Sequence, residues 1–295
     1  MAPAGSGSVT WSVNREMVVG AGWGRAILLQ LAHPSIAAAL HDHSSFRGGL
    51  GPAVRRLRAT VGAMLSITFG GPEAMIAAAA GINTIHDRVR GAGYSAHDPE
   101  LQRWVHATLV DSIPRTYECL VGPLTPAERD RYCVEAAIME PLLGMPHGWL
   151  PRDRAQLDAY MDEMLGSGRL AVNDASRALA HAVLYPPRWR AAWPAFRPMQ
   201  LLTIGSLPAP IRRAYGLAWS ARDARALARW TAVLRVLVRC LPPAARHWPM
   251  ARMMSKCSPD EKRLLRSHPP RRSRSWLTAR GASRRRLPPP LTPAP

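Results

Sequence analysis

The chain has 295 residues, of which 47% are apolar, so it can build one large domain or two small ones around a substantial core. Its net charge of +19 is unevenly distributed, because residues 256–295 alone carry eleven Lys or Arg against two acidic residues. The rest of the chain is only moderately basic, so a nucleic-acid-binding function would rest mainly on this tail.

Several other classes of protein are disfavoured by the cysteine spacing, by the sequence of the N-terminus and by missing motifs. The four cysteines lack the C-x-x-C spacing of a zinc or iron–sulfur site, and there is no G-x-S-x-G motif of a serine hydrolase. Residues 1–14 lack the basic start and apolar run of a signal peptide, so a cytoplasmic protein is expected. The most apolar stretch, residues 26–40, is interrupted by Gln30, His33 and Pro34 and is too polar for a membrane span.

The composition favours an all-α protein. Ala, Leu, Arg and Met are abundant, whereas runs of β-branched residues are scarce. We expect a single globular multi-helix domain over residues 12–255. The small polar residues 1–11 and the basic, Arg/Pro-rich residues 256–295 are expected to be largely disordered.

Helical periodicity predicts the first elements at residues 14–40, 52–69 and 71–91, with a loop at residues 41–46. Pro34 is expected to kink or split the first of these helices. Pro72 suits the first turn of the third helix, and Gly91 suits its end.

Start signals define the helices that follow. Asp98, Pro99 and Glu100 combine an N-cap, a first-turn proline and an acid at the helix start, and Pro114 is expected to kink this helix. Thr125 opens a capping box. The remaining helices are predicted at residues 125–139, 153–165, 174–184 and 221–240, with prolines punctuating residues 197–219 and a short helix after Ser258.

His86 is the most informative residue. It takes the place of an apolar residue in the helical stripe formed by Met75, Ala79, Ile82 and Val89, so we expect its imidazole to be buried. Arg90 lies one turn later on the same predicted face. A buried imidazole with a cation one turn away suits a haem-iron ligand and a propionate partner. The alternative is a core histidine that is hydrogen-bonded to a carbonyl.

Three further groups are candidates for chemistry, each with a structural alternative. His41 and His43 could bind a metal from a loop or be solvated. His106 shares a helix face with apolar residues, so it is expected to point inward. It is either a functional residue or a core histidine whose hydrogen bonds are satisfied. Arg56 and Thr60 are four residues apart beside an apolar stripe, where they could hydrogen-bond dioxygen or a haem propionate. Alternatively, they are a surface arginine and a threonine bonded to its own backbone.

A series of motifs follows one another over residues 12–250. They lie at residues 14–16, 24–26, 28–34, 43–44, 56–60, 85–91, 94–101, 104–112, 123–130, 207–212 and 215–217. Their order and spacing resemble those of the MpaB/rubber-oxygenase family, which includes fungal MpaB and bacterial latex-clearing protein. The similarity is closest to short bacterial homologues of the family.

This resemblance implies an all-helical fold that binds haem b between helices through one axial histidine, which would be His86. It implies that Arg90 meets a propionate and that Arg56 and Thr60 flank the haem as catalytic residues. His106, as a further catalytic residue, and Thr108, as a cofactor-binding residue, match a second inner pair of the family.

Two positions separate the chain from the rubber oxygenases themselves. Ala59 stands where those enzymes carry a lysine, and Glu16 is the candidate for their catalytic glutamate. Rubber cleavage as such is therefore not part of the expectation.

The family chemistry is attack by haem-activated dioxygen on a carbon–carbon double bond of an isoprenoid chain. The resemblance therefore implies a haem-dependent oxygenase, with dioxygen and a small apolar, unsaturated substrate as partners and no specific nucleic acid. A second hypothesis is a haem-binding sensor or carrier without turnover. A third is a helical interaction protein whose basic tail contacts nucleic acid or an anionic membrane.

A chain that ends at Ser267 is predicted to melt at the same temperature as the full chain and to hold the same amount of haem. The residues beyond it are rich in Arg, Pro and Ser, so they bury too little apolar surface to offset an ordering cost of about 1–2 kcal/mol per residue. Thermal denaturation and haem absorbance measure the two quantities. A clear drop in either would mean that the tail packs on the body.

Overall fold

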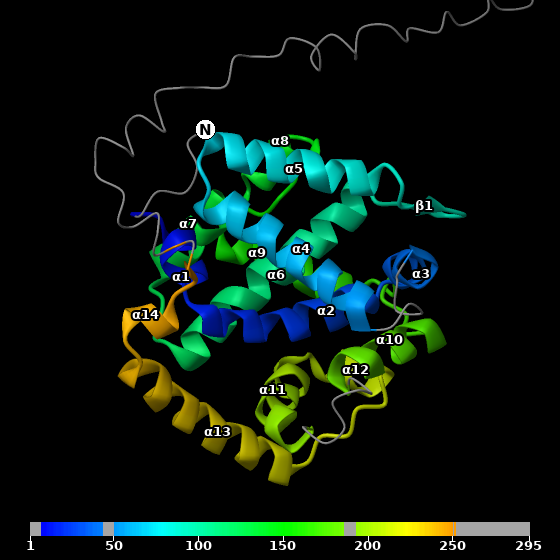
Figure 1. Cartoon of the computed structure of the whole chain (residues 1–295). Helices are drawn as coiled ribbons and strands as arrows, with labels where there is room; N and C mark the ends of the chain where they lie inside the picture. Colours follow the sequence, from blue (N-terminus) through cyan, green and yellow to red (C-terminus); the bar gives the residue numbers. More distant parts are fainter. Residues whose placement is uncertain (1–6, 44–49, 186–192, 250, 252–295) are drawn as a thin grey trace, which may run out of the picture.

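The computed structural model describes residues 7–43, 50–185, 193–249 and 251. Within these residues the protein is all-α, as predicted, and its strands are two short segments that form one hairpin (Figure 1). The basic tail and the helix expected after Ser258 lie outside the described residues. In the part of the chain that the structure describes, none of the helices combines the length and apolar content that a bilayer crossing requires.

The elements follow one another with short connections. In chain order they are α1 (Val9–Asn14), the 3-10 helix η1 (Met17–Gly22), α2 (Trp23–Leu31), α3 (Pro34–His43), α4 (Leu50–Phe69), α5 (Pro72–His86), β1 (Arg90–Gly91), β2 (Tyr94–Ser95), α6 (Pro99–Leu120), α7 (Pro126–Ala136), α8 (Met139–Leu143), α9 (Arg154–Gly166), α10 (Asp174–Leu184), α11 (Trp193–Ser206), α12 (Ala209–Ala214), α13 (Ala221–Cys240) and α14 (Pro243–Arg246).

The local start signals act as predicted. The Asp98 carboxylate accepts a hydrogen bond from the Glu100 N–H at 2.9 Å at the start of α6. Thr125 and Glu128 form the predicted capping box of α7. Pro34 splits the first helical region, since α2 ends at Leu31 and α3 begins at Pro34. Pro114 lies inside α6, which continues past it to Leu120.

Three predicted boundaries are wrong, and tertiary contacts explain two of them. Helix α1 begins at Val9 rather than at residue 14, because the Glu135 carboxylate accepts hydrogen bonds from the Val9 and Thr10 N–H groups. Helix α3 includes the first three residues of the expected loop and ends at His43, and the carboxylate of Asp42 in its last turn accepts a hydrogen bond from Tyr94. Helix α5 ends at His86 rather than at Gly91.

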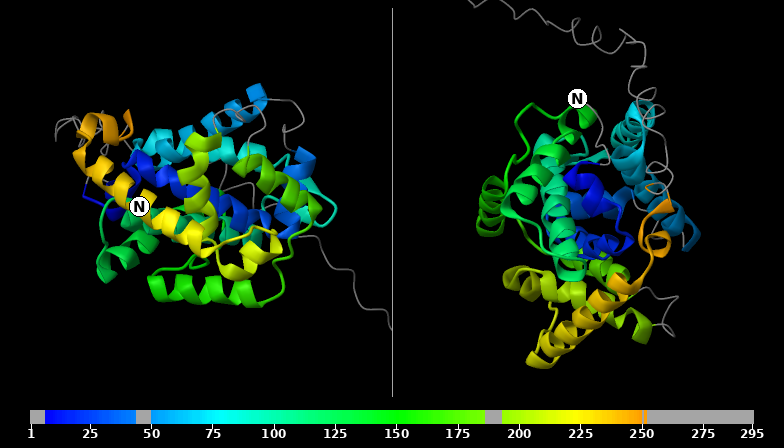
Figure 2. Two further views of the ribbon diagram at one scale, coloured as in Figure 1. Left: turned by 90° about the horizontal axis from the view of Figure 1, so that it is seen from below. Right: turned by 90° about the vertical axis from the view of Figure 1, so that its left-hand side faces the viewer.

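Helix α6 is the centre of the fold. Helix α2 and η1 pack along it, and the antiparallel pair α4 and α5 covers one side of the body (Figures 1 and 2). Helices α11 and α13 lie on the opposite side. Trp104 of α6 is fully buried and donates a hydrogen bond from Nε1 to the Leu29 carbonyl at 3.2 Å. Close approach of η1 to α6 requires glycine at position 22, where a Cβ would lie 2.8 Å from the Ser112 carbonyl oxygen.

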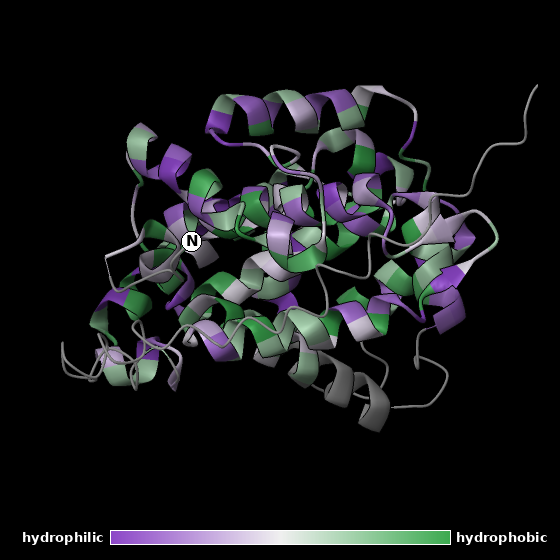
Figure 3. Ribbon diagram, turned by 90° about the horizontal axis from the view of Figure 1, so that it is seen from above, coloured by the Kyte–Doolittle hydropathy of each residue, from purple (hydrophilic) through white to green (hydrophobic). Residues whose placement is uncertain are grey.

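Hydrophobic and hydrophilic residues are interspersed along the helices, as expected where each helix has a buried and a solvated face (Figure 3). The main core draws on α1–α3, α6, α7 and α9–α12, and Leu28, Leu29 and Leu31 of α2 are almost completely buried in it. A second, smaller cluster joins Trp11 of α1 to Phe69 at the end of α4. Their rings meet edge to face with centroids 4.8 Å apart.

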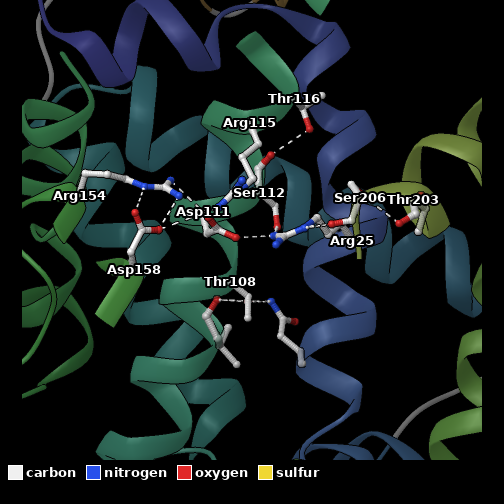
Figure 4. Close-up of polar contacts among 12 residues, drawn as sticks. Arg25, Thr108, Asp111, Ser112, Arg115, Thr116, Arg154, Asp158, Thr203 and Ser206 are labelled. Carbon is white, nitrogen blue, oxygen red and sulfur yellow. Dashed lines mark hydrogen bonds and ion pairs between the residues drawn. The ribbon is translucent and has the colours of Figure 1, made fainter. Parts of the chain in front are cut away.

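A buried charge cluster ties the central helices together (Figure 4). The Asp111 carboxylate of α6 lies 2.6 Å from Arg25 Nη1 of α2 and 2.6 Å from Arg115 Nε. Arg154 of α9 approaches it to 3.3 Å. Arg25 also donates to Ser112 Oγ and to the Ser206 carbonyl of α11, both at 2.8 Å. One carboxylate and one guanidinium therefore connect α2, α6, α9 and α11.

The two central charges are almost completely withdrawn from solvent, with side-chain exposures of 6% for Arg25 and 1% for Asp111. Burial alone would raise the pKa of Asp111, but Arg25, Arg115 and Arg154 outweigh it and hold the pKa below its usual value. Burial lowers the pKa of Arg25, and Asp111 opposes this effect. The cluster is stable because each charge has a partner.

Asp111→Asn is predicted to lower the free energy of unfolding by about 3–5 kcal/mol, because it leaves Arg25 buried without its charged partner. In the wild type, the folded pKa of Asp111 lies below the unfolded one. Its contribution is therefore complete above the unfolded pKa of about 3.8 and is lost as the pH falls through the folded pKa. Urea denaturation followed by circular dichroism measures the change.

The matched control is Asp158→Asn, which removes the half-exposed partner of Arg154 by the same chemical substitution. Exposed ion pairs contribute about 0–1 kcal/mol, so this variant should unfold almost as the wild type does. Equal losses in the two variants would show that burial of Asp111 is not what makes the cluster important.

Candidate functional site

The candidate site centres on His86, the last residue of α5. Pro72 starts this helix and Glu73 lies in its first turn, while Met75 and Ala79 form its buried stripe. As predicted from that stripe, His86 faces inward, although it is half-buried rather than fully enclosed. Its Nδ1 is buried and has no hydrogen-bond partner among the described residues. The alternative was a core histidine hydrogen-bonded to a carbonyl. At Nδ1 of His86 the structure shows no such hydrogen bond among the described residues.

The surroundings of His86 favour the neutral imidazole. Burial lowers its pKa, and the nearby His97 lowers it further, while Asp87 acts in the opposite direction. The His86 and His97 rings lie nearly perpendicular, with centroids 5.7 Å apart. His97 Nε2 lies 2.8 Å from Asp87 Oδ1. A neutral imidazole has a lone pair on one ring nitrogen, which is what a metal ion requires of a histidine ligand.

A small hairpin follows His86 and positions the groups around it. Strands β1 and β2 pair Gly91 with Tyr94, and a Cβ at position 91 would lie 2.5 Å from the Tyr94 ring, so only glycine fits. Gly93 supplies the turn with a φ of 82°. The Tyr94 hydroxyl donates to Asp42 Oδ2 at 2.7 Å, which fixes the hairpin to α3.

The predicted position of Arg90 is wrong. Because α5 ends at His86, Arg90 lies in β1 and not one helical turn further along the same face. Its side chain is exposed and forms no ion pair with a described residue. Its carbonyl accepts a hydrogen bond from His43 Nε2 at 3.3 Å. Arg90 remains close to His86 in the chain, but its guanidinium points to solvent.

The predicted pair Arg56 and Thr60 lies on α4, the helix that packs against α5. Thr60 is exposed, so of the two alternatives the structure has the surface position for it, and its catalytic role stays a prediction. The side chain of Arg56 lies outside the described part of the structure.

His106 and Thr108 are both on α6, but they contact different helices. His106 Nε2 donates to the Ala136 carbonyl of α7 at 3.0 Å, and burial lowers its pKa to about 4. Its Nδ1 is buried without a partner among the described residues. Thr108 Oγ1 donates to the Val105 carbonyl and accepts from Gln30 Nε2 of α2. The structure therefore does not bring His106 and Thr108 together as one pair.

Glu16, the candidate catalytic glutamate, has a structural role. It is completely buried, and its two carboxylate oxygens meet Arg246 Nε at 2.5 Å and His247 Nε2 at 3.2 Å. Its backbone forms an isolated bridge with His247, and the Trp248 N–H donates to the Arg15 carbonyl. The carboxylate is thus occupied by the end of the described chain.

One polar group of the same kind as His86 escaped sequence reasoning. His33 lies between α2 and α3, and its Nδ1 is buried without a partner among the described residues. Burial lowers its pKa, Arg169 lowers it further, and Asp98 opposes them. The signals in the sequence were its place in the motif at residues 28–34 and its position directly before the helix-splitting Pro34.

No protein-only metal site is formed within the described ranges, where no group of three or more His, Cys, Asp or Glu side chains is arranged to hold an ion. His41 and His43 lie at the end of α3 instead of in a loop. His41 Nδ1 lies 3.4 Å from Asp42 Oδ1, while His43 bonds to the hairpin as described above. A hollow of about 310 Å³ lies elsewhere, between α11 and the start of α13, and includes Leu201 and Trp219.

Comparison with known proteins places the chain in a family. The model of the family described as "ER-bound oxygenase mpaB/B'/Rubber oxygenase, catalytic domain" matches residues 11–236. Two uncharacterized proteins, from Mycobacterium bovis and Mycobacterium tuberculosis, are each 28% identical to this chain over 227 residues, which are 74% of this chain and 88% of each relative. No solved structure matches the chain. The chain therefore belongs to the mpaB/rubber-oxygenase catalytic-domain family and, at this coarse level, is an oxygenase.

Proposed function

We propose that the protein is a haem b-dependent oxygenase that uses dioxygen on a small apolar, unsaturated substrate of isoprenoid type. His86 would be the ligand of its iron. The observation that carries this proposal is the buried, unpartnered Nδ1 of His86 in a chain whose oxygenase family match spans this residue. Buried polar atoms in native proteins are almost always satisfied, so an iron ion or a water molecule can serve as the missing partner of this nitrogen, and the family match favours the iron.

The chemistry of His86 fits an iron ligand. Burial lowers the pKa of its imidazole and so favours the neutral form, from which a metal does not have to displace a proton. The hairpin anchored by Tyr94 on Asp42 fixes the chain directly after His86 and holds His97 beside it. A ligand that is oriented by its surroundings binds a metal with less loss of side-chain freedom.

The remaining residues of the proposal have separate roles. Haem supplies an iron that binds and activates dioxygen, which the side chains of the protein alone cannot do. Thr60 and Arg56, on the helix packed against α5, would supply a hydroxyl and a guanidinium as hydrogen-bond donors to dioxygen or to a haem propionate. The exposure of Thr60 in the protein alone leaves its hydroxyl available for such a partner. Arg90 would be a cation near a propionate, while His106 would be a further catalytic residue and Thr108 a cofactor-binding residue on α6.

His86→Ala is predicted to abolish stoichiometric haem retention and to leave helical content unchanged, since residue 86 is the last of its helix and is only half-buried. Haem content is measured by the Soret absorbance after reconstitution, and helicity by circular dichroism. His147→Ala is the control. His147 is exposed, so this variant should bind haem as the wild type does. A full Soret band with unchanged axial-ligand spectra in His86→Ala would exclude His86, and His106 would be the next ligand to test.

Thr60→Ala and Arg56→Ala are predicted to slow turnover roughly a hundredfold or more while haem content changes little. A donor placed at developing negative charge contributes about 2.7–4 kcal/mol to catalysis. Dioxygen consumption and carbonyl products are measured with a panel of isoprenoid alkenes. Thr84→Ala is the control, because that exposed hydroxyl only bonds to the Ala80 carbonyl of its own helix. Reversible dioxygen binding by the wild type without product from any alkene would favour the sensor or carrier instead.

A further inference from the structure

Helix α13 packs on the body through one face only. It contacts α11 and α6, and Leu227, Leu234 and Val238 lie on the packed face. Arg235 fixes its rotation by donating from Nε and Nη2 to the Cys119 carbonyl, at 3.1 and 2.7 Å. The helix runs along the outer edge of the molecule, with α11 on its inner side (Figures 1 and 2).

The rest of α13 carries a row of exposed apolar side chains. Trp230, Val233 and Leu237 recur at helical spacing, Val236 lies beside them and is 61% exposed, and Leu241 follows directly after the helix. Half of the ten large apolar side chains that are exposed within the described ranges belong to this row. Such clustering differs from the single exposed apolar residues that any surface carries and marks an interaction site.

The charge of α13 is almost entirely of one sign. Arg222, Arg225, Arg229 and Arg239 are all exposed, and helical spacing places the first three alongside the apolar row. The single acid of the helix, Asp223, caps the helix start through Ser220 and pairs with Arg197 at 2.6 Å. The exposed face of α13 is therefore both apolar and cationic.

We propose that α13 docks the protein on an anionic lipid bilayer, with the helix lying in the plane of the membrane surface. Apolar side chains beside arginines suit the boundary between acyl chains and anionic headgroups. The arginines preclude a spanning orientation. The inference is independent of haem binding and of the oxygenase reaction.

Charge favours an anionic bilayer on this face over the two alternatives, a second copy of the protein and its own basic tail. A second copy of the protein would place arginines against arginines across the apolar row, which is unfavourable. The tail beyond residue 255 also carries a large excess of basic residues, so it does not complement this face. An anionic surface satisfies both the apolar row and the arginines.

The test is cosedimentation of the full-length protein with vesicles of phosphatidylcholine alone or of equal parts phosphatidylcholine and phosphatidylglycerol. We expect binding to the anionic vesicles, weakened by salt, and little binding to the neutral ones. Absence of binding to the anionic vesicles would refute the proposal.

Two variants locate the binding on α13. Trp230→Ser/Val233→Ser/Leu237→Ser should weaken partitioning roughly tenfold or more by removing the apolar contact. Arg222→Gln/Arg225→Gln/Arg229→Gln should weaken it on the order of a hundredfold, since each cation near an anionic surface contributes about fivefold. All six residues are exposed, so circular dichroism and thermal melting should match the wild type.

The matched control is Ile76→Ser/Val134→Ser, which removes exposed apolar side chains from α5 and α7 and should bind as the wild type does. If the α13 serine variant also binds as the wild type does, the basic tail alone carries binding and the proposal is wrong. If sedimentation equilibrium instead shows a wild-type dimer that this variant loses, the apolar row is an interface between copies, which also overturns the proposal.

Discussion

The rest of the structure depends on the pairing of Asp111 with Arg25 inside the core. Taking two charges out of water costs several kcal/mol per ion, and only close partners offset this cost. Asp111 has three arginines around it, and Arg25 reaches a hydroxyl and a carbonyl besides the carboxylate. These directional contacts determine how α2 and α6 are oriented toward each other, which apolar packing alone would determine less strictly.

The environment of His86 follows from that arrangement step by step. Helix α2 leads through His33 and Pro34 into α3, so the position of α3 is set by the helix that Arg25 anchors. Asp42 at the end of α3 accepts the Tyr94 hydroxyl and thereby holds the hairpin behind His86. The central charge cluster is thus linked to the candidate site by the chain that runs from α2 into α3 and by the hydrogen bond from Tyr94 to Asp42.

Local sequence signals predicted most of the fold. The features that they did not predict depend on contacts between distant segments of the chain. The caps at Asp98 and Thr125 act within four residues, so they were visible in the sequence, as was the inward stripe that contains His86. The end of α5 at His86 was not visible, because pairing of β1 with β2 takes over before Gly91, and this error moved Arg90 off the predicted face. The partners of His106 and Thr108 depend on which helices α6 meets, and helical periodicity carries no such information.

Glu16 has a consequence for where the folding unit ends. The family match stops at residue 236, but the arginine that pairs with this buried carboxylate, Arg246, and the histidine that hydrogen-bonds to it, His247, come after it. A fragment cut at the family boundary would keep the carboxylate and lose both partners, leaving a charge in the interior. During synthesis the same contact, which joins residues 230 positions apart, forms only after almost all of the described chain has left the ribosome. The first and last described segments therefore close the fold together.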